Sequence, residues 1–520
     1  MARPWQAISK TLLALRPAGL KAGTHFSAGT PFRVGCKRSM MTLADVVEGL
    51  SGMRPTRAGT HFSATQPVRG FVIDSRQAGP RDAQERTLVF VALRGEKTDG
   101  HVYVNDAFSR GAIAALIDRD VETEAVVVDV RPGSPPPATL PLPICLRVPD
   151  VMTALQALAR WWRNRFASLR VVGITGSVGK SSTKELVAAV LSRRFDVLKS
   201  EGNLNNEIGL PLTLLKLDAR HQRAVLEMGM YARGEIAMLC SIARPVVGVV
   251  TNVGPVHLER LGTIEAVAQA KAELVEALPS DGVVVLNYDD EHVRQMAGLT
   301  RARALYYGLD PAADLWADDI HSVGLEGVRF QLHYRNETMH VQVPLLGRHS
   351  VHTALRAAAV GLAEGMIWDH ILEGLRDRRA QLRLVAVPGP NGSTILDDTY
   401  NASPESTIAA LNLLDELEGR KIAVLGDMLE LGAHEEEGHR KVGLRAMDVV
   451  SLLVTVGKRG KIIGDEARRN GLPAERLRVC ASNDEAIEYL KDAVRPGDIM
   501  LVKGSRGLHM EDIVAALGQG

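Results

Sequence analysis

The sequence predicts an α/β protein of three consecutive domains, with a parallel sheet in the central domain and a second open sheet in the last. Apolar runs alternate with helical patterns over most of the chain, and this alternation restarts after residue 380. The 520 residues also leave room for about three domains of roughly 100–200 residues each. We expect a basic extension over residues 1–40, disordered and outside the fold, and domains over residues 41–167, 168–378 and 379–520.

The extension has an unusual charge pattern. The first 44 residues contain seven Lys or Arg side chains and no acidic one before Asp45. A transit peptide has this character, but an upstream extension that takes no part in folding is the interpretation we favour.

Short apolar runs mark the expected strands. The first domain contains two of them, Leu88–Leu93 and Ala125–Val130, and a helix from about Val151 to Arg165 leads into the second domain. In the central domain four runs are separated by helical patterns: Arg170–Thr175, Ala224–Glu227, Val246–Thr251 and Val283–Leu286. Residues Val323–Val343 have the pattern of appended antiparallel strands. The last domain contains four further runs: Thr394–Asp397, Ile422–Leu425, Leu452–Val456 and Ile499–Val502.

Composition excludes several classes of function. The formal net charge is +1, so nothing in the overall charge points to nucleic acid or to an acidic membrane. No apolar run approaches the ~20 residues that span a bilayer. The four cysteines are scattered without a CxxC pair, which suits a reducing cytoplasm and argues against a zinc site.

A glycine-rich turn in Leu169–Ser182 is the strongest chemical signal. Such turns wrap backbone N–H groups around phosphate oxygens and direct the N-terminus of the next helix at the anion. Lys180 would reach the terminal phosphates, and the Ser181 hydroxyl would bind Mg²⁺. The common pattern has a glycine where this chain has Ile174. The residues expected to hold ATP are Thr175, Gly176, Ser177, Val178, Gly179, Lys180 and Ser181.

Polar side chains follow the ends of several expected strands, where open sheets bind ligands. Glu227 closes one strand and is a candidate Mg²⁺ ligand beside the loop. Asn203, Asn205 and Asn206 could cap a helix or hold a polar substrate. Taken singly, His257 is more typical of a structural histidine and Lys271 of a solvated lysine. Two adjacent acids, Asp397 and Asp398, followed by Tyr400 and Asn401, exceed what a cap requires, whereas the cluster Asp74, Ser75 and Arg76 is equally consistent with a plain surface.

Together these motifs resemble the Mur ligase superfamily. From about Met41 onward, TGSVGKSS resembles the ATP loop of that family, GNLNNEIG its substrate loop, LEMGMYARGEI its metal-glutamate segment and NVGPVHLERLGTIEAVAQAKAEL its metal-histidine and carbamylated-lysine segment. The motifs DDTYNASPES, LGDMLELG and VKGSRG resemble the branch that adds D-alanyl-D-alanine to a UDP-muramyl tripeptide. No DNPR-like motif of the branches that add diaminopimelate or lysine is present.

The resemblance implies an N-terminal α/β UDP-binding domain, a central P-loop ATPase domain and a C-terminal Rossmann-like domain. It implies a cytoplasmic, ATP-dependent ligase that acts through an acyl phosphate in peptidoglycan precursor synthesis, as a monomer with two Mg²⁺ ions and a carbamylated Lys271. The catalytic residues implied are Lys180, Lys271, His257, Asp398, Tyr400 and Asn401, and the metal ligands are Ser181, Glu227, His257 and Lys271. Asn287 and Asp290 would also contact ATP. Substrate would contact Asp74, Ser75, Arg76, Asn203, Asn205, Asn206, Lys503, Ser505 and Arg506.

One segment departs from the family pattern. Where the family has a GxHNxxNA-like motif, this chain has Gly347–Ala354, with Ser350 and His352 in the region of two asparagines. The sequence therefore leaves open which residues contact the adenine of ATP. Three other functions also stay open: a superfamily ligase that adds a single amino acid, a regulator that binds nucleotide without catalysis, and a P-loop kinase.

Overall fold

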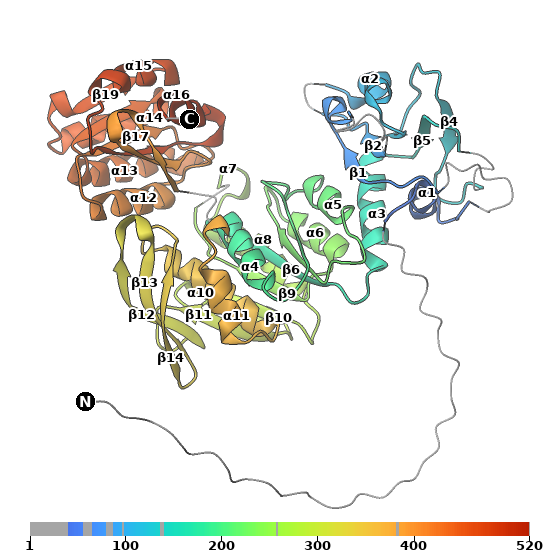
Figure 1. Cartoon of the computed structure of the whole chain (residues 1–520), viewed down its shortest axis with the longest axis horizontal. Coiled ribbons are helices and arrows are strands. Elements are labelled where there is room, and N and C mark those ends of the chain that lie inside the picture. Colours follow the sequence, from blue (N-terminus) through green and yellow to red (C-terminus); the bar gives the residue numbers. More distant parts are fainter. Residues whose placement is uncertain are drawn as a thin grey trace, which may run out of the picture. The chain divides into compact units, whose positions relative to one another are not determined.

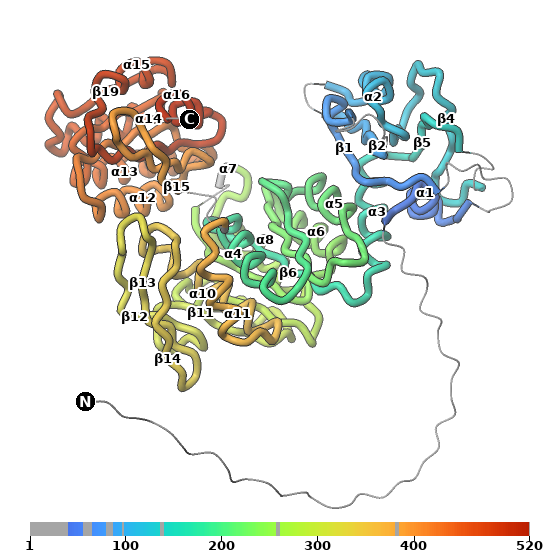
Figure 2. Tube along the Cα trace, viewed as in Figure 1, coloured from blue at the N-terminus to red at the C-terminus, as the bar shows by residue number. Residues whose placement is uncertain are grey.

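The computed structural model describes residues 40–55, 65–79, 87–95, 98–135, 140–255, 258–380 and 384–518. The extension predicted over residues 1–40 lies outside this range except for Met40. Three sheets follow one another along the chain, each with its own helices (Figure 1). The Cα trace changes from blue through green and yellow to red as it leaves one sheet for the next, so each sheet is made by one consecutive stretch of sequence (Figure 2).

The first sheet has five parallel strands in the order β1-β2-β3-β5-β4. The strands are β1 (Gly70–Val72), β2 (Leu88–Val91), β3 (Ala114–Ile117), β4 (Val126–Asp129) and β5 (Ile144–Arg147), and the helices are α1 (Leu43–Ser51), α2 (Val104–Arg110) and α3 (Val151–Asn164). Thr42 and Asp45 form a capping box at the start of α1, in which each side chain accepts a hydrogen bond from the other's backbone N–H. The described fold therefore begins with a well-defined helix start.

The central sheet has nine strands in the order β14-β13-β12-β11-β10-β9-β6-β8-β7. They are β6 (Arg170–Thr175), β7 (Val197–Lys199), β8 (Arg223–Glu227), β9 (Val247–Val250), β10 (Val283–Asn287), β11 (Arg303–Gly308), β12 (Leu315–Ser322), β13 (Val328–Tyr334) and β14 (Glu337–Val343). Strands β6 to β12 run parallel, whereas β13 and β14 form an antiparallel extension, as predicted for Val323–Val343. Strand β6 lies between β8 and β9, which pairs Ile174 with Glu227 and Thr175 with Val250.

Eight helices accompany the central sheet in the part of the chain described. They are α4 (Lys180–Leu191), α5 (Gly209–Leu214), α6 (Glu235–Ala243), α7 (Leu258–Leu261), α8 (Ile264–Glu276), α9 (Glu291–Gln295), α10 (Ser350–Ala363) and α11 (Trp368–Leu375). Helix α10 packs against α4, the helix that follows the glycine-rich turn.

The last sheet has six strands in the order β15-β16-β20-β17-β18-β19, all parallel except the pair β15–β16. The strands are β15 (Val385–Pro388), β16 (Thr394–Asp398), β17 (Lys421–Gly426), β18 (Leu452–Val456), β19 (Leu477–Cys480) and β20 (Ile499–Lys503). The helices are α12 (Pro404–Glu416), α13 (Glu435–Val449), α14 (Gly457–Arg469), α15 (Asn483–Ala493) and α16 (Glu511–Leu517).

Helix α3 joins the first sheet to the helices of the second. The Trp162 indole N–H donates to the Leu217 carbonyl at 3.0 Å. The buried Arg163 guanidinium donates to the carbonyls of Phe166, Leu169 and Ala243. Around these bonds lies one apolar core, to which buried residues of both the first sheet and the central sheet contribute.

The predicted strands and helices are confirmed with small shifts of their ends. Helix α4 begins at Lys180, so that the last phosphate-loop residues themselves form its first turn. No described helix is long and apolar enough to cross a membrane.

A buried carboxylate holds the far end of α10. The fully buried Glu364 side chain follows the last turn of this helix and accepts hydrogen bonds from Arg170 and Arg223, the first residues of β6 and β8. The contact ties α10 to the amino ends of the two strands whose carboxyl ends carry Thr175 and Glu227.

We predict that Glu364→Ala lowers the free energy of unfolding by about 2 kcal/mol, because it leaves the mostly buried Arg223 without its counter-charge, while the half-exposed Arg170 loses less. Thermal unfolding followed by circular dichroism measures this as a fall of several degrees. The matched control is Glu373→Ala, which breaks an exposed pair with Arg193 and should shift the midpoint little. Equal midpoints for the two variants would contradict the prediction.

Candidate active site

The turn between β6 and α4 packs closely against the end of β9. Gly176 has φ +142°, and a Cβ there would lie 1.8 Å from Thr251 Oγ1, so the position excludes every side chain. Asn252 accepts hydrogen bonds from the N–H groups of Ser177 (3.0 Å, through its carbonyl) and Val178 (2.9 Å, through Oδ1). The Thr251 hydroxyl donates to the Val178 carbonyl at 2.7 Å. The neighbouring strand therefore determines the shape of the predicted phosphate loop.

Lys180 lies over this loop as the first residue of α4. Gly179 precedes it with φ +85°, a conformation that glycine adopts at little cost. The Lys180 amine donates to the carbonyls of Gly176 (2.8 Å) and Ser177 (3.2 Å). The loop, the amine and the N-terminus of α4 together form an anion-binding arrangement.

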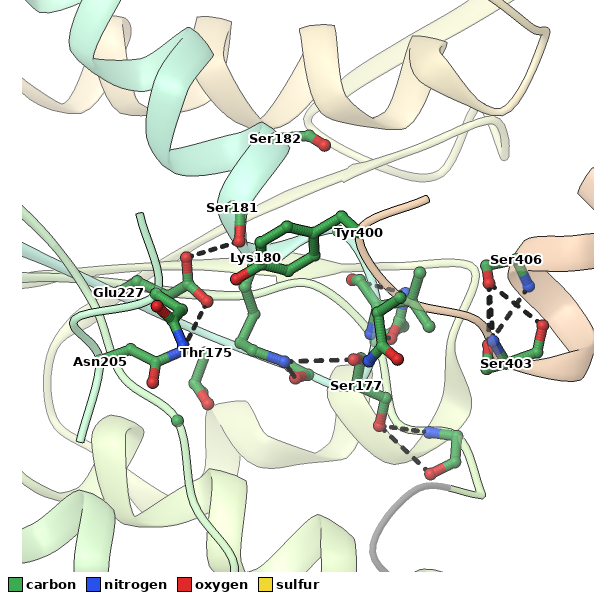
Figure 3. Close-up of a pocket in the computed structure, with 18 of the residues that line it drawn as sticks. Thr175, Ser177, Lys180, Ser181, Ser182, Asn205, Glu227, Tyr400, Ser403 and Ser406 are labelled. Carbon is green, nitrogen blue, oxygen red and sulfur yellow. Dashed lines mark hydrogen bonds between the residues drawn. The ribbon is translucent and has the colours of Figure 1, made fainter. Parts of the chain in front are cut away.

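Glu227 is held at the carboxyl end of β8, next to β6. The residue is 2% exposed. One carboxylate oxygen accepts from the Ser181 hydroxyl at 2.7 Å, and the other accepts from the Asn205 side-chain amide at 2.8 Å (Figure 3). The hydroxyl and the carboxylate are hard oxygen donors of the kind that Mg²⁺ prefers.

The asparagines predicted to hold substrate have different roles. Asn205 bonds Glu227, and its carbonyl accepts from the Gly229 N–H at 2.8 Å. Asn206 accepts from the N–H groups of Ile208 and Gly209, at the turn that leads into α5. All three asparagines, including Asn203, line the same pocket.

Lys271 on α8 is buried beside this group. Its residue is 2% exposed, and among the described residues it forms no ion pair. Burial lowers the pKa of its amine well below the ordinary value, and the charge of Lys180 lowers it further. The structure therefore favours a neutral amine facing the pocket.

The last sheet brings together the motifs DDTYNASP and KGSRG. Asp398 pairs with Lys503 across strands β16 and β20, and the Lys503 amine donates to the Asp398 carboxylate at 2.6 Å. The same amine donates to the Asn401 carbonyl at 2.9 Å and is buried. Asp397, in contrast, accepts from the N–H and hydroxyl of Thr399 and shapes the turn. The two adjacent acids therefore have separate tasks.

Two further predicted residues, Ser505 and Arg506, follow β20 of the last sheet. The Ser505 hydroxyl accepts from the Leu429 N–H at 2.9 Å. The Arg506 guanidinium lies 5.2 Å from the centre of the Tyr400 ring, an arrangement typical of a cation–π contact. Tyr400 lines the same pocket as Lys180 and Ser181 (Figure 3).

One pocket of about 740 Å³ contains most of the predicted site, within the usual range for ligand pockets. The predicted residues that line it are Thr175, Gly176, Ser177, Val178, Gly179, Lys180, Ser181, Asn203, Asn205, Asn206, Glu227, Lys271, Asn287, Asp398, Tyr400, Asn401, Lys503, Ser505 and Arg506.

Some predicted residues lie elsewhere. Asp290 caps α9 and accepts from the Val253 N–H, and it does not line the pocket. Asp74, Ser75 and Arg76 form a short turn by the first sheet, where Asp74 accepts hydrogen bonds from the exposed Arg76. His257 lies outside the described residues. Within those residues no group of three His, Cys, Asp or Glu side chains could hold a metal ion.

The pocket also contains residues that sequence reasoning did not assign. Three of them come from α10 and the turn before it: His349, Thr353 and Arg356. Burial lowers the pKa of His349, which favours its neutral form. His349 and Thr353 belong to the segment Gly347–Ala354, whose departure from the family pattern was the available sequence signal, whereas Arg356 lies just beyond it. Ser350 donates to the Leu346 carbonyl and His352 bonds Asp289, so both have partners within the protein.

Comparison with known proteins agrees with this architecture. The family profile described as "Mur ligase middle domain" matches residues 174–361, and the profile "Mur ligase, glutamate ligase domain" matches residues 379–506. These ranges include the phosphate loop, Glu227, Lys271 and the Asp398–Lys503 pair.

Relatives extend the similarity over most of the chain. The UDP-N-acetylmuramoyl-tripeptide–D-alanyl-D-alanine ligase of Bacillus subtilis is 35% identical over 489 residues, which are 92% of this chain and 98% of that protein. The enzyme of the same name from Escherichia coli is 35% identical over 439 residues, 82% of this chain and 90% of that one.

Solved structures agree as well. MurF from Acinetobacter baumannii has a TM-score of 0.77 at 27% identity and covers 92% of this chain and 99% of its own. MurF ligase from Thermotoga maritima in complex with ADP has a TM-score of 0.69 at 26% identity, covering 86% and 97%. The chain therefore belongs to the Mur ligase family, in the group of UDP-N-acetylmuramoyl-tripeptide–D-alanyl-D-alanine ligases.

Proposed function

We propose that this chain uses ATP to join D-alanyl-D-alanine to UDP-N-acetylmuramoyl-tripeptide in peptidoglycan precursor synthesis. The observation that supports this most is that one pocket is lined both by the phosphate loop with Glu227 and by the Asp398–Lys503 pair of the last sheet. A ligase needs both parts, because the nucleotide must activate an acid in the place where an amine then attacks it. The relatives named UDP-N-acetylmuramoyl-tripeptide–D-alanyl-D-alanine ligase support the choice of substrates.

The reaction we propose has two steps. The terminal carboxylate of the tripeptide attacks the γ-phosphorus of ATP, the bond to ADP breaks, and an acyl phosphate forms. The amine of D-alanyl-D-alanine then attacks the acyl carbon, loses a proton, and phosphate leaves. Both steps gather negative charge, so positioned cations and N–H donors contribute most of the acceleration. Lys180 and the loop amides supply them on the nucleotide side.

The residues fit Mg²⁺ at one position. Ser181 and Glu227 offer hard oxygens in contact with each other beside the phosphate loop and would hold the ion, which neutralises phosphate charge when bound. We propose that His257 and a carbamylated Lys271 serve a second ion. A neutral buried amine supports this, because only the unprotonated form adds CO₂ to give a carboxylate-like ligand.

The remaining assignments extend the same proposal. Asp398, Tyr400 and Asn401 face the reacting centre, Asn203, Asn205, Asn206, Lys503, Ser505 and Arg506 contact the peptide substrates, and Asp74, Ser75 and Arg76 hold the uridine end. Asn287 and Asp290 support the nucleotide. We propose the domain limits 41–167, 168–378 and 379–520, and a cytoplasmic monomer.

Lys180→Ala should lower ligation at least about 100-fold, because the lost cation faces charge that develops on the phosphates. ADP release with both peptide substrates measures the rate. Lys441→Ala, which removes an exposed lysine of α13, is the control and should keep full activity. Substantial turnover by Lys180→Ala would overturn the assignment of the phosphate loop.

Lys271→Ala should be nearly inactive and should recover in part when formate or acetate is added, since a small carboxylate can take the place of the carbamate. The same ADP-release assay with increasing carboxylate tests this. Wild-type activity of the variant without rescue would remove the carbamate role.

ADP release by the wild type should require both UDP-N-acetylmuramoyl-tripeptide and D-alanyl-D-alanine. Replacing the dipeptide by D-glutamate, L-lysine or diaminopimelate should give only background release. A preference for a single amino acid would instead support another ligase activity of the superfamily, and ATP binding without ADP release would support a regulator.

A further inference from the structure

Arg356 is a buried cation beside the phosphate loop. It lies on α10 and lines the pocket, and the residue is only 4% exposed. Its guanidinium lies next to Gly179, where an added Cβ would come within 3.2 Å of Nη2. No part of the proposed mechanism uses this side chain.

The guanidinium is only partly satisfied by the protein. Arginine carries five N–H donors. Nη2 donates to the Thr353 hydroxyl at 2.8 Å and Nη1 reaches the Tyr307 hydroxyl at 3.5 Å, whereas the buried Nε has no hydrogen-bond partner. In the described part of the chain, Arg356 forms no ion pair with a carboxylate.

The neighbouring groups do not supply a negative charge. Burial raises the pKa of Tyr307 to about 12, so its hydroxyl stays protonated. Asp289, whose charge acts on Tyr307, bonds His352 and the N–H groups of Leu309 and Asp310. An arginine that is buried without a counter-charge is costly, and a bound anion would offset that cost.

We propose that Arg356 binds the phosphate groups of the nucleotide, as a second cation beside Lys180 and the loop amides. The ligand class is a nucleoside di- or triphosphate, whose oxygens match the planar fork of donors on a guanidinium. This role rests on the proposed use of ATP. It also gives a role to the segment Gly347–Ala354, which departs from the family pattern. Thr353 of that segment accepts a hydrogen bond from the guanidinium and orients it toward Gly179.

Calorimetric titration with MgADP and with adenosine tests the proposal without turnover. Arg356→Met and Arg356→Gln should weaken MgADP binding tenfold or more and leave adenosine binding unchanged. Arg356→Lys keeps a cation, so its affinity for MgADP should fall clearly less than that of the two uncharged variants. Thermal unfolding without nucleotide should show the Met variant to be at least as stable as the wild type, because a buried uncompensated charge is gone.

Arg163→Met is the matched control, since Arg163 is also buried but donates only to backbone carbonyls away from the pocket. It should bind MgADP as the wild type does, even with a lower unfolding midpoint. Unchanged MgADP affinity in both uncharged Arg356 variants would overturn the proposal, as would an equal loss of adenosine affinity. A wild type that binds no MgADP would overturn the proposed function as well.

Discussion

The site depends on the close contact between the turn after β6 and the end of β9. Gly176 can approach Thr251 only because it has no side chain, and the approach lets Thr251 and Asn252 bond three backbone groups of the turn. The turn therefore has its shape before any ligand arrives. Because β8 lies on the other side of β6, Glu227 ends at the same edge as this turn, within reach of Ser181.

Charge around the pocket is arranged in three different ways. Asp398 and Lys503 neutralise each other at 2.6 Å, and burial favours a Lys271 without charge. Arg356 forms no ion pair with an acid among the described residues. A polyanionic nucleotide complements this pattern, because its phosphates can supply the negative charge that Arg356 lacks within the protein.

Much of the fold could be predicted because local patterns and tertiary packing agree. The apolar runs that became β6, β9, β10 and β18 are buried on both faces, as strands in the middle of a parallel sheet must be, and such runs are visible in sequence. Strands such as β7 and β19 were not predicted. They are short and half-exposed edge strands, so their residues carry no continuous apolar signal.

The same distinction holds for the site. The turn at Gly176–Ser181 and Glu227 follow strand ends of the central sheet, and the sequence by itself determined that they gather at one edge, because parallel strands bring their carboxyl ends together. Asp398 ends a strand of the last sheet, so only the tertiary structure brings it to the same pocket. Only the tertiary structure decided the roles of Asp397, Lys271 and Arg356. The first shapes a turn, burial lowers the pKa of the second, and the third lies next to Gly179 although it comes 177 positions later in the chain. These outcomes depend on distance, burial and neighbouring charge, which are properties of the packed molecule and leave no periodic pattern in the sequence.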